Sequence, residues 1–219
     1  MRKLIIAIDG PSGVGKGTVA RAIASELGYR HVDSGAMYRA VGWRALQLGV
    51  PVEDEARLAD IARTSAIDIS ATAVTIDGVD VTRAIRTPEI DRAAAAVARL
   101  PRVRAILVDR QRAMGEGGGI VMEGRDIGTV VFPGADVKLY LDASAEERAR
   151  RRANDPLHSG PAALAEVASA LQERDRSDST RAASPLYAAA DATVIDTTHA
   201  PVGDVVASVM EIVRQTLRA

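Results

Sequence analysis

A glycine-rich run near the start of the chain has the residue types that surround phosphate groups. It follows an apolar stretch at residues 4–8 and consists of Gly10, Pro11, Ser12, Gly13, Val14, Gly15, Lys16, Gly17 and Thr18. Glycines let backbone N–H groups turn toward phosphates, the start of a helix adds positive potential, and a lysine reaches the transferred phosphate. We interpret the run as a loop that binds a nucleoside triphosphate. The alternative is a glycine-rich turn without a ligand.

One position of this loop departs from the usual pattern. Gly17 stands where a serine or threonine normally contacts magnesium, and Thr18 follows one place later. We therefore hypothesise that the hydroxyl group of Thr18 contacts the magnesium instead, directly or through water. We expect Lys16 to be exposed on its loop, so that Lys16→Ala would abolish transfer while the chain stays folded.

A second group of polar residues lies at a predicted boundary between a strand and a helix. Asp33 and Ser34 stand at this boundary, and Arg39 follows about one helical turn later. A carboxylate at a strand end can hold the waters of Mg²⁺, and an arginine can bind an acceptor's phosphate through two N–H groups. The alternative is structural, with Ser34 as a helix N-cap and Arg39 as a solvated helix residue.

A third group follows a predicted core strand, at the end where open α/β sheets bind ligands. Residues 123–128 read EGRDIG. Arg125 is suited to lie across phosphate groups, and Asp126 is suited to accept a hydrogen bond from a base amino group. The alternative is a loop in which Arg125 and Asp126 pair with each other.

Arginines and acids cluster in two further segments. The first segment holds Arg148, Arg150, Arg151 and Arg152, and the second holds Arg174, Asp175, Arg176, Asp178 and Arg181. In a helix, residues 148 and 152 share a face, as do 174 and 178. An arginine that closes over a transferring phosphoryl group accelerates the reaction by roughly 10³–10⁵. The alternative is a solvated, salt-bridged helix surface.

The composition excludes several other kinds of chemistry. The 219 residues include no cysteine, so disulfides, thiolate nucleophiles and cysteine-bound metals are excluded. A net charge of −1 argues against a general nucleic-acid binder. His31, His158 and His199 lack metal-ligand spacing, and we interpret them as incidental. Residues 4–8 are too short for a membrane span or a signal peptide, which favours a soluble, cytoplasmic protein.

The hydrophobic pattern predicts an α/β fold that brings the polar groups together. Residues 4–8 form a β-branched run typical of a central strand buried on both faces. Strands separated by helices imply crossovers and a parallel sheet. Further strands are predicted at 119–123, 136–141 and 192–196, and helices at 19–27, 35–48, 88–98, 101–115, 144–153, 161–178 and 201–217.

Two segments interrupt this alternation. A short helix at 53–64 precedes three alternating runs at 66–70, 73–77 and 79–81, which predict an antiparallel inserted subdomain. Residues 154–161 hold turn formers and little apolar material, which predicts a mobile flap.

The motifs also resemble a known family when they are taken in order. GPSGVGKGT, DSGAMYR, PRVR, EGRDIGTVV and RDRSD with the later TRA closely resemble the bacterial cytidylate kinases across nearly the whole chain. This resemblance implies transfer of the γ-phosphoryl group of ATP to CMP or dCMP with Mg²⁺. It also implies a P-loop fold in which a five-stranded parallel sheet flanked by helices carries an α+β monophosphate-binding insert and a short lid. The single kinase domain, 1–219, would divide into a core at about 1–50, 99–147 and 179–219, an insert at 51–98 and a lid at 148–178.

The resemblance also implies roles for individual residues. Residues 10–18 would hold ATP, and Mg²⁺ would lie near Asp33 and Thr18. The lid would contribute three arginines toward ATP, namely Arg148, Arg151 and Arg152. The remaining residues would bind the acceptor: its phosphate by Arg39, Arg125 and Arg181, its cytosine by Arg104 and Asp126, and its sugar by Arg174 and Asp178. Ser34 would be a further substrate-binding residue. The catalytic charges would be those of Lys16, Arg125 and Arg181.

One position departs from the family pattern. Where the family often has a serine that hydrogen-bonds the base, this sequence has Ala95. One neutral hydrogen bond is worth about 0.5–1.5 kcal/mol, so we expect the preference for cytosine to soften and persist.

Two rival functions stay open on the residues alone. A kinase for another monophosphate or for a metabolite hydroxyl would share the phosphate-binding loop, although the arginines favour a phosphorylated acceptor. A nucleotide switch usually carries an N-K-x-D motif, which this sequence lacks. We expect small-molecule partners only, no nucleic acid or membrane, and a monomer.

Overall fold

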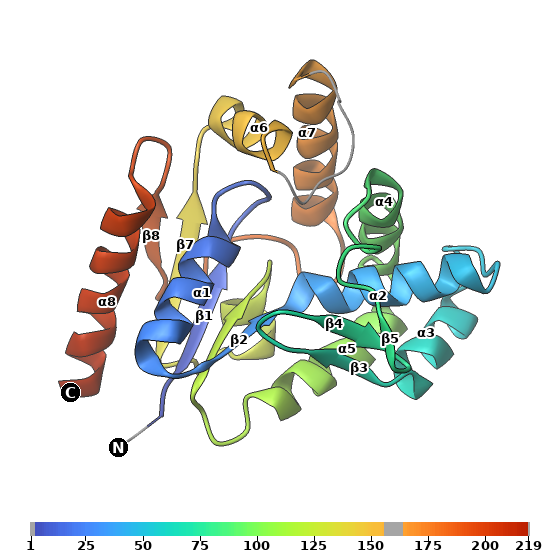
Figure 1. Cartoon of the computed structure of the whole chain (residues 1–219), viewed down its shortest axis with the longest axis horizontal. Coiled ribbons are helices and arrows are strands. Elements are labelled where there is room, and N and C mark those ends of the chain that lie inside the picture. Colours follow the sequence, from blue (N-terminus) through green and yellow to red (C-terminus); the bar gives the residue numbers. More distant parts are fainter. Residues whose placement is uncertain (1–2, 156–163, 219) are drawn as a thin grey trace.

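A parallel sheet of five strands forms the centre of the molecule (Figure 1). The computed structural model describes residues 3–155 and 164–218. The strand order is β2-β6-β1-β7-β8, and every neighbouring pair is parallel. The strands are β1 (Ile5–Asp9), β2 (Arg30–Asp33), β6 (Ile120–Glu123), β7 (Val137–Asp142) and β8 (Thr193–Asp196). The predicted fold class is confirmed.

Helices cover both faces of this sheet. Successive side chains of a strand point to opposite faces, so Ile6 and Ile8 pack with α1 (Lys16–Leu27) and α8 (Val202–Arg218). Ala7 belongs to a second apolar cluster on the other face. That cluster includes residues of α2 (Ser34–Gln47) and α5 (Pro101–Met114). Strand β1 is therefore central and buried on both faces, as its β-branched run predicts.

A small antiparallel sheet lies beside α2 and α3. It consists of β3 (Ile67–Ile69), β4 (Val74–Ile76) and β5 (Val79–Asp80), and it follows α3 (Glu55–Thr64). The predicted antiparallel segment is thus confirmed. Its buried residues belong to the same apolar cluster as α2, so this segment shares a core with the main sheet. Helix α4 (Pro88–Val97) then packs on α2.

Two helices lie together near the carboxyl ends of the central strands (Figure 1). They are α6 (Ala145–Ala153) and α7 (Leu164–Thr180). Of the flap predicted at 154–161, only Asn154 and Asp155 lie within the described residues. No helix in the described part of the chain is long and apolar enough to cross a membrane.

Three details differ from the sequence-based expectations. Helix α1 begins at Lys16 and not at residue 19. Strand β8 is at the sheet edge, where Val194 is 61% exposed, because the hydrophobic pattern of a strand does not specify its neighbours. A π-helical turn, η1 (Ile127–Val131), follows β6 and was not predicted.

Candidate functional site

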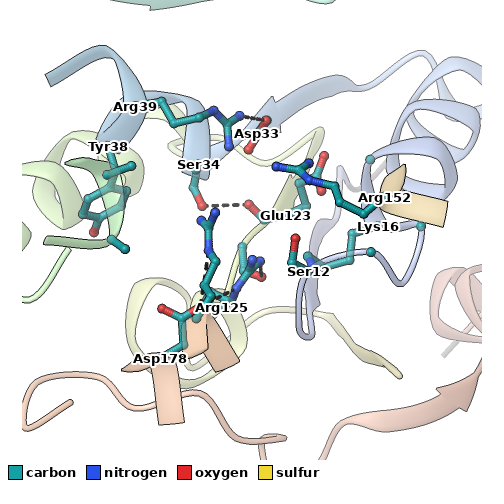
Figure 2. A pocket seen from close by; sticks show the side chains of 18 of the residues that line it. Ser12, Lys16, Asp33, Ser34, Tyr38, Arg39, Glu123, Arg125, Arg152 and Asp178 are labelled. Atoms are coloured by element: carbon teal, nitrogen blue, oxygen red, sulfur yellow. Dashed lines mark hydrogen bonds and ion pairs between the residues drawn. The ribbon is translucent and has the colours of Figure 1, made fainter. Parts of the chain in front are cut away.

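A cavity of about 590 Å³ lies at the carboxyl ends of β1, β2 and β6 (Figure 2). Its walls come from the glycine-rich loop, α2, α4, the loop after β6, and the two helices α6 and α7. Parallel strands place their carboxyl ends at one edge, which is where open α/β sheets bind ligands. Most of the site residues predicted from the sequence line this cavity. Four do not line it, namely Gly10, Pro11, Val14 and Arg148.

The glycine-rich loop joins β1 to α1 in a conformation that requires glycine. Gly10 has a φ of +142°, and a Cβ there would lie 2.1 Å from the carbonyl oxygen of Leu141. The loop then curls around its own lysine. Nζ of Lys16 donates hydrogen bonds to the carbonyl oxygens of Gly10, at 2.8 Å, and Pro11, at 2.5 Å.

Lys16 is buried, which corrects the expectation that it is exposed. Its exposed fraction is 6%, because it occupies the first position of α1 beneath the loop. Burial, with Arg125 nearby, lowers the pKa of Lys16 to about 7. Near neutral pH the side chain is therefore divided between amine and ammonium, and an anionic ligand would stabilise the ammonium form.

Glu123 explains why position 17 of the loop is glycine. A Cβ on Gly17 would lie 3.0 Å from Oε1 of Glu123 and 3.3 Å from Nη1 of Arg21. Oε1 of Glu123 is also 2.9 Å from Nε2 of His31, and both side chains are buried. His31 is therefore a buried partner of Glu123 and does not itself line the cavity. That it is incidental to the chemistry stays a prediction.

Asp33 and Ser34 have both structural and site-forming contacts. Oδ1 of Asp33 accepts a hydrogen bond from the N–H of Ala36 at the start of α2, and Oδ2 accepts one from Arg39 at 2.6 Å. Burial opposes ionisation of Asp33, but the charge and hydrogen bond of Arg39 outweigh it and lower the pKa to about 2. Oγ of Ser34 donates to the carbonyl of Glu123 at 2.7 Å, and this ties α2 to β6.

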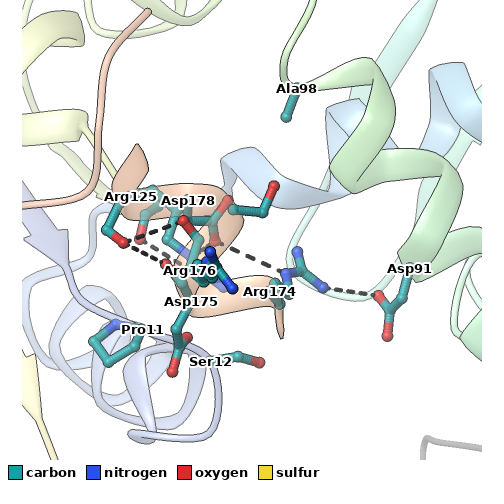
Figure 3. Close-up of polar contacts among 12 residues, drawn as sticks. Pro11, Ser12, Asp91, Ala98, Arg125, Arg174, Asp175, Arg176 and Asp178 are labelled. Carbon is teal, nitrogen blue, oxygen red and sulfur yellow. Dashed lines mark hydrogen bonds and ion pairs between the residues drawn. The ribbon is translucent and has the colours of Figure 1, made fainter. Parts of the chain in front are cut away.

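Asp178 contacts three arginines, and Figure 3 shows two of them, Arg125 and Arg174. Its Oδ2 accepts a hydrogen bond from Nε of Arg125 at 3.0 Å and lies 3.9 Å from Nε of Arg174. Its Oδ1 lies 3.5 Å from Nη1 of Arg181. Burial opposes the negative charge of Asp178, yet these arginines outweigh it and lower its pKa.

Arg104 and Asp126 form a buried ion pair at the far end of the cavity. Nη2 of Arg181 lies 3.7 Å from Oδ1 of Asp126, and the guanidinium of Arg104 lies 5.5 Å from the ring centre of Tyr38. Arg125 and Asp126 therefore have different partners, and the alternative in which they pair with each other is wrong. Small apolar residues line the cavity nearby, namely Ala94, Ala95 and Ala98.

The four arginines of α6 differ in their contacts, and only two of them line the cavity. Nη1 of Arg148 pairs with Asp175 at 2.5 Å and lies outside the cavity lining. Arg150 is exposed and pairs with Glu147 within its own helix. The other two line the cavity: Arg151 contacts Glu147 and Thr197, and Arg152 pairs with Asp91.

Asp91 links the end of α6 to α7. It pairs with Arg152 and lies 3.3 Å from Nη1 of Arg174 (Figure 3). Sequence reasoning did not single out this aspartate. It also missed several residues that line the cavity, namely Arg21, Tyr38, Arg86, Asn154 and Asp155. Tyr38 belongs to the DSGAMYR motif, and Asn154 and Asp155 to the predicted flap, but neither signal indicates that these side chains face the cavity. No motif marks Arg21 or Arg86, which only the packing of the chain brings to the cavity.

Known proteins resemble this chain over most of its length. The family model described as cytidylate kinase matches residues 6–215. The chain belongs to the cytidylate kinase family. A cytidylate kinase from Pelotomaculum thermopropionicum is 49% identical over 207 residues, which cover 92% of each chain. A cytidylate kinase from Geobacillus kaustophilus is 47% identical over 221 residues and 99% of each chain.

The fold is also shared beyond the cytidylate kinases. The structure of a gluconokinase from Sinorhizobium meliloti superposes with a TM-score of 0.52 and 17% identity. That match covers 100% of this chain and 96% of the gluconokinase. At this identity the likeness concerns the fold alone.

Proposed function

We propose that this cytidylate kinase family member transfers the γ-phosphoryl group of ATP to CMP and dCMP. The observation that carries the proposal is that one cavity contains both a glycine-rich phosphate-binding loop and a buried ion pair suited to a base. Ser12 and Lys16 of the glycine-rich loop lie on one side (Figure 2), and the buried pair of Arg104 and Asp126 lies on the other side, near Tyr38. The same cavity is lined by arginines that would surround the phosphates, namely Arg39, Arg125, Arg152, Arg174 and Arg181.

The acceptor would lie with its phosphate toward the loop and its base toward Asp126. Arg39, Arg125 and Arg181 would hold the phosphate, Arg174 and Asp178 the sugar, and Arg104 and Asp126 the cytosine. Ser34 would be a further substrate-binding residue. Residues 10–18 would hold ATP with help from Arg148, Arg151 and Arg152. Asp33, Asp126 and Asp178 pair with arginines of this set. These carboxylates hold the guanidinium groups in place.

The chemistry would be a direct in-line transfer. An oxygen of the acceptor phosphate attacks the γ-phosphorus as the bond to the leaving ADP oxygen breaks, so no side chain forms a covalent intermediate. Catalysis then consists of positioning and of neutralising the charge that spreads over the transferred group. Lys16, Arg125 and Arg181 are the protein charges assigned to that role.

Mg²⁺ would enter with ATP and neutralise its phosphates. The donors that we assign to it, the Thr18 hydroxyl and the Asp33 carboxylate, both line the cavity. They are the hard oxygen ligands that magnesium prefers, and magnesium takes its other ligands from water and substrate phosphates. Because Asp33 already accepts from Arg39 and Ala36, contact through a water molecule suits it best.

The proposal also divides the chain into a core, a monophosphate-binding insert and a lid. Within one kinase domain, residues 1–50, 99–147 and 179–219 would form the core, 51–98 the monophosphate-binding insert, and 148–178 the lid. The apolar cluster that continues from α2 into the small sheet supports one domain. We further propose a monomer that acts in the cytoplasm, in pyrimidine nucleotide metabolism.

A panel of phosphoryl acceptors tests the function. Purified protein would be mixed with ATP and Mg²⁺, with CMP, dCMP, UMP, AMP, GMP or dTMP added singly, and diphosphate formation would be measured. We expect the highest kcat/KM with CMP and dCMP, and no transfer by Lys16→Met. Preference for another monophosphate would reassign the base pocket, and ATP binding without transfer to any acceptor would refute the kinase activity.

Asp126→Ala is the variant that tests how the base is read. It should lower the ratio of kcat/KM for CMP to that for UMP, while the KM for ATP stays close to that of the wild type. An unchanged ratio in a folded variant would show that the base is recognised elsewhere.

A further inference from the structure

The π-helical turn η1 is capped by a residue from a distant strand. Asp126 occupies its N-cap position, but the Asp126 side chain makes no capping hydrogen bond. Oδ1 of Asp9 accepts the N–H of Ile127 at 2.8 Å, and Oδ2 accepts the N–H of Gly128 at 2.7 Å. The first N–H groups of a helix have no partner within it, so a carboxylate that accepts two of them satisfies the turn.

This arrangement leaves the side chain of Asp126 available for the cavity. An aspartate at an N-cap normally turns back to accept an N–H of its own helix. Here its carboxylate instead pairs with Arg104 and lies 3.7 Å from Arg181, at the far end of the cavity. One carboxylate cannot take both orientations at once. Asp9, at the end of β1, therefore performs the local task that Asp126 would otherwise perform.

We propose that Asp9 is a positioning residue for the acceptor, because it caps η1 in place of Asp126 and so keeps Asp126 directed at the base. This inference rests on the proposed function, which assigns that end of the cavity to cytosine. Asp9 lies where β1 leads into the glycine-rich loop, so the same residue also ties the ATP loop to the acceptor loop. It acts through Asp126 and touches no substrate.

The surroundings of Asp9 make the cap sensitive to acid. Asp9 is 4% exposed, and burial raises its pKa to about 6, against the lowering effect of the two backbone hydrogen bonds. The charged and titratable groups around it are Asp126, which raises the pKa further, Lys16 from α1, which lowers it, and Tyr140 from β7. The aliphatic part of Lys138 lies near Gly128. Above this pKa both carboxylate oxygens of Asp9 accept hydrogen bonds, from the N–H groups of Ile127 and Gly128. Below it, one of the two oxygens carries a proton and faces a backbone N–H.

Amide NMR of the ligand-free protein tests the cap directly. We expect the amide proton shifts of Ile127 and Gly128 to move together between pH 5 and 8, with one midpoint near 6. In Asp9→Asn the same two shifts should lose the step near pH 6 and keep at most a smaller change from Lys16, whose pKa is lowered to about 7. This measurement in the wild type does not depend on any variant folding, and it contains no nucleotide whose own phosphate titrates.

Steady-state kinetics of Asp9→Asn test the consequence for the acceptor. Asparagine keeps the shape but presents one N–H₂ group to a backbone N–H. We expect the KM for CMP to rise about tenfold, the net worth of one to two hydrogen bonds. The preference for CMP over UMP should fall, and the KM for ATP should stay within about twofold. The matched control is Asp136→Asn, because Oδ2 of Asp136 accepts the N–H of Ile5 at 2.8 Å, at the opposite end of β1.

Several outcomes would overturn the proposal. It is wrong if the two amide shifts do not titrate in the wild type, or if folded Asp9→Asn keeps its KM for CMP and its selectivity. An equal rise in the KM for ATP, or the same changes in Asp136→Asn, would indicate a general structural effect and would also refute it. A wild type that prefers another monophosphate would refute the proposed acceptor alone, and the same comparison with that monophosphate would still decide the role of Asp9.

Discussion

Replacement of Asp178 by asparagine separates the structural role of this residue from its role toward the ligand. Asp178 is 6% exposed and lies within 4 Å of three guanidinium groups, those of Arg125, Arg174 and Arg181. Asparagine keeps the size and one acceptor oxygen but removes the negative charge. The variant should therefore hold three converging positive charges, with Asp91 beside Arg174 and Asp126 beside Arg181 as carboxylates that remain. We expect it to be less stable and to respond more strongly to anions.

The size of the effect follows from the burial of the cluster. Removal of one partner of a buried ion pair costs about 3–5 kcal/mol. The side chains of Arg125 and Arg174 are 18% and 21% exposed, and the remaining acceptor oxygen offsets part of the loss. We therefore expect a decrease in unfolding free energy of about 2–3 kcal/mol. For a chain of this length, that corresponds to a decrease in Tm of about 4–12 °C.

Thermal unfolding at low salt, with and without inorganic phosphate, measures both parts of the prediction. Phosphate should raise the Tm of Asp178→Asn more than it raises the Tm of the wild type, because it supplies the missing negative charge. The folded pKa of Asp178 is lowered, so its contribution to stability is fully present above about pH 4 and is lost as the pH falls through the folded value. The difference between variant and wild type should accordingly shrink in acid.

Asp60→Asn is the matched control. Asp60 also pairs with an arginine, Arg63, at 2.6 Å, but both side chains are more than half exposed. Exposed pairs contribute about 0–1 kcal/mol, so Tm should change little. A decrease in Tm for Asp178→Asn no larger than that of the control would refute the reasoning, as would an equal response of variant and wild type to phosphate.

Three further predictions concern the loop and the base pocket. Because the pKa of Lys16 is lowered to about 7, the protein should take up close to one proton when ATP binds at pH 8. Calorimetry in buffers of different ionisation enthalpy measures this proton uptake. Equal uptake by Lys16→Met would contradict the prediction. Gly17→Ala would place a Cβ 3.0 Å from Oε1 of Glu123. The Glu123 carboxylate must then shift by a few tenths of an ångström, whereas alanine gains about 0.5–1 kcal/mol over glycine within a helix. We therefore expect little net change in stability and a larger rise in the KM for ATP than in that for CMP, and an unchanged KM for ATP would show that the carboxylate moves freely. Ala95→Ser should raise the kcat/KM ratio of CMP to UMP by up to about tenfold, and an unchanged ratio would mean that the base does not reach this wall.

Much of the architecture could be predicted because its signals are local. The β-branched run before the glycine-rich loop, and the alternation of strands with helices, indicate a parallel sheet with ligands at its carboxyl edge. Spacing within a motif likewise indicates which residue types belong together, as with Lys16 and its glycines. These inferences need only neighbours in the sequence, so the printed chain is sufficient for them.

The partners of the charged residues depend on tertiary structure. The chain has 28 basic and 29 acidic residues, and no local pattern states which of them meet. Arg125 pairs with Asp178 from α7 and not with the adjacent Asp126. Asp9 accepts from an N–H 119 residues later. Such pairs form because distant elements pack side by side.

Burial likewise becomes visible only in the folded chain. The sequence by itself determined that a lysine follows the glycine-rich loop and that position 17 lacks a side chain. Only the packing of α1 against β6 decided that Lys16 is buried and that the carboxylate of Glu123 lies against Gly17. The physical reason is that solvation and steric contact depend on three-dimensional distance, and sequence spacing specifies that distance only within one element.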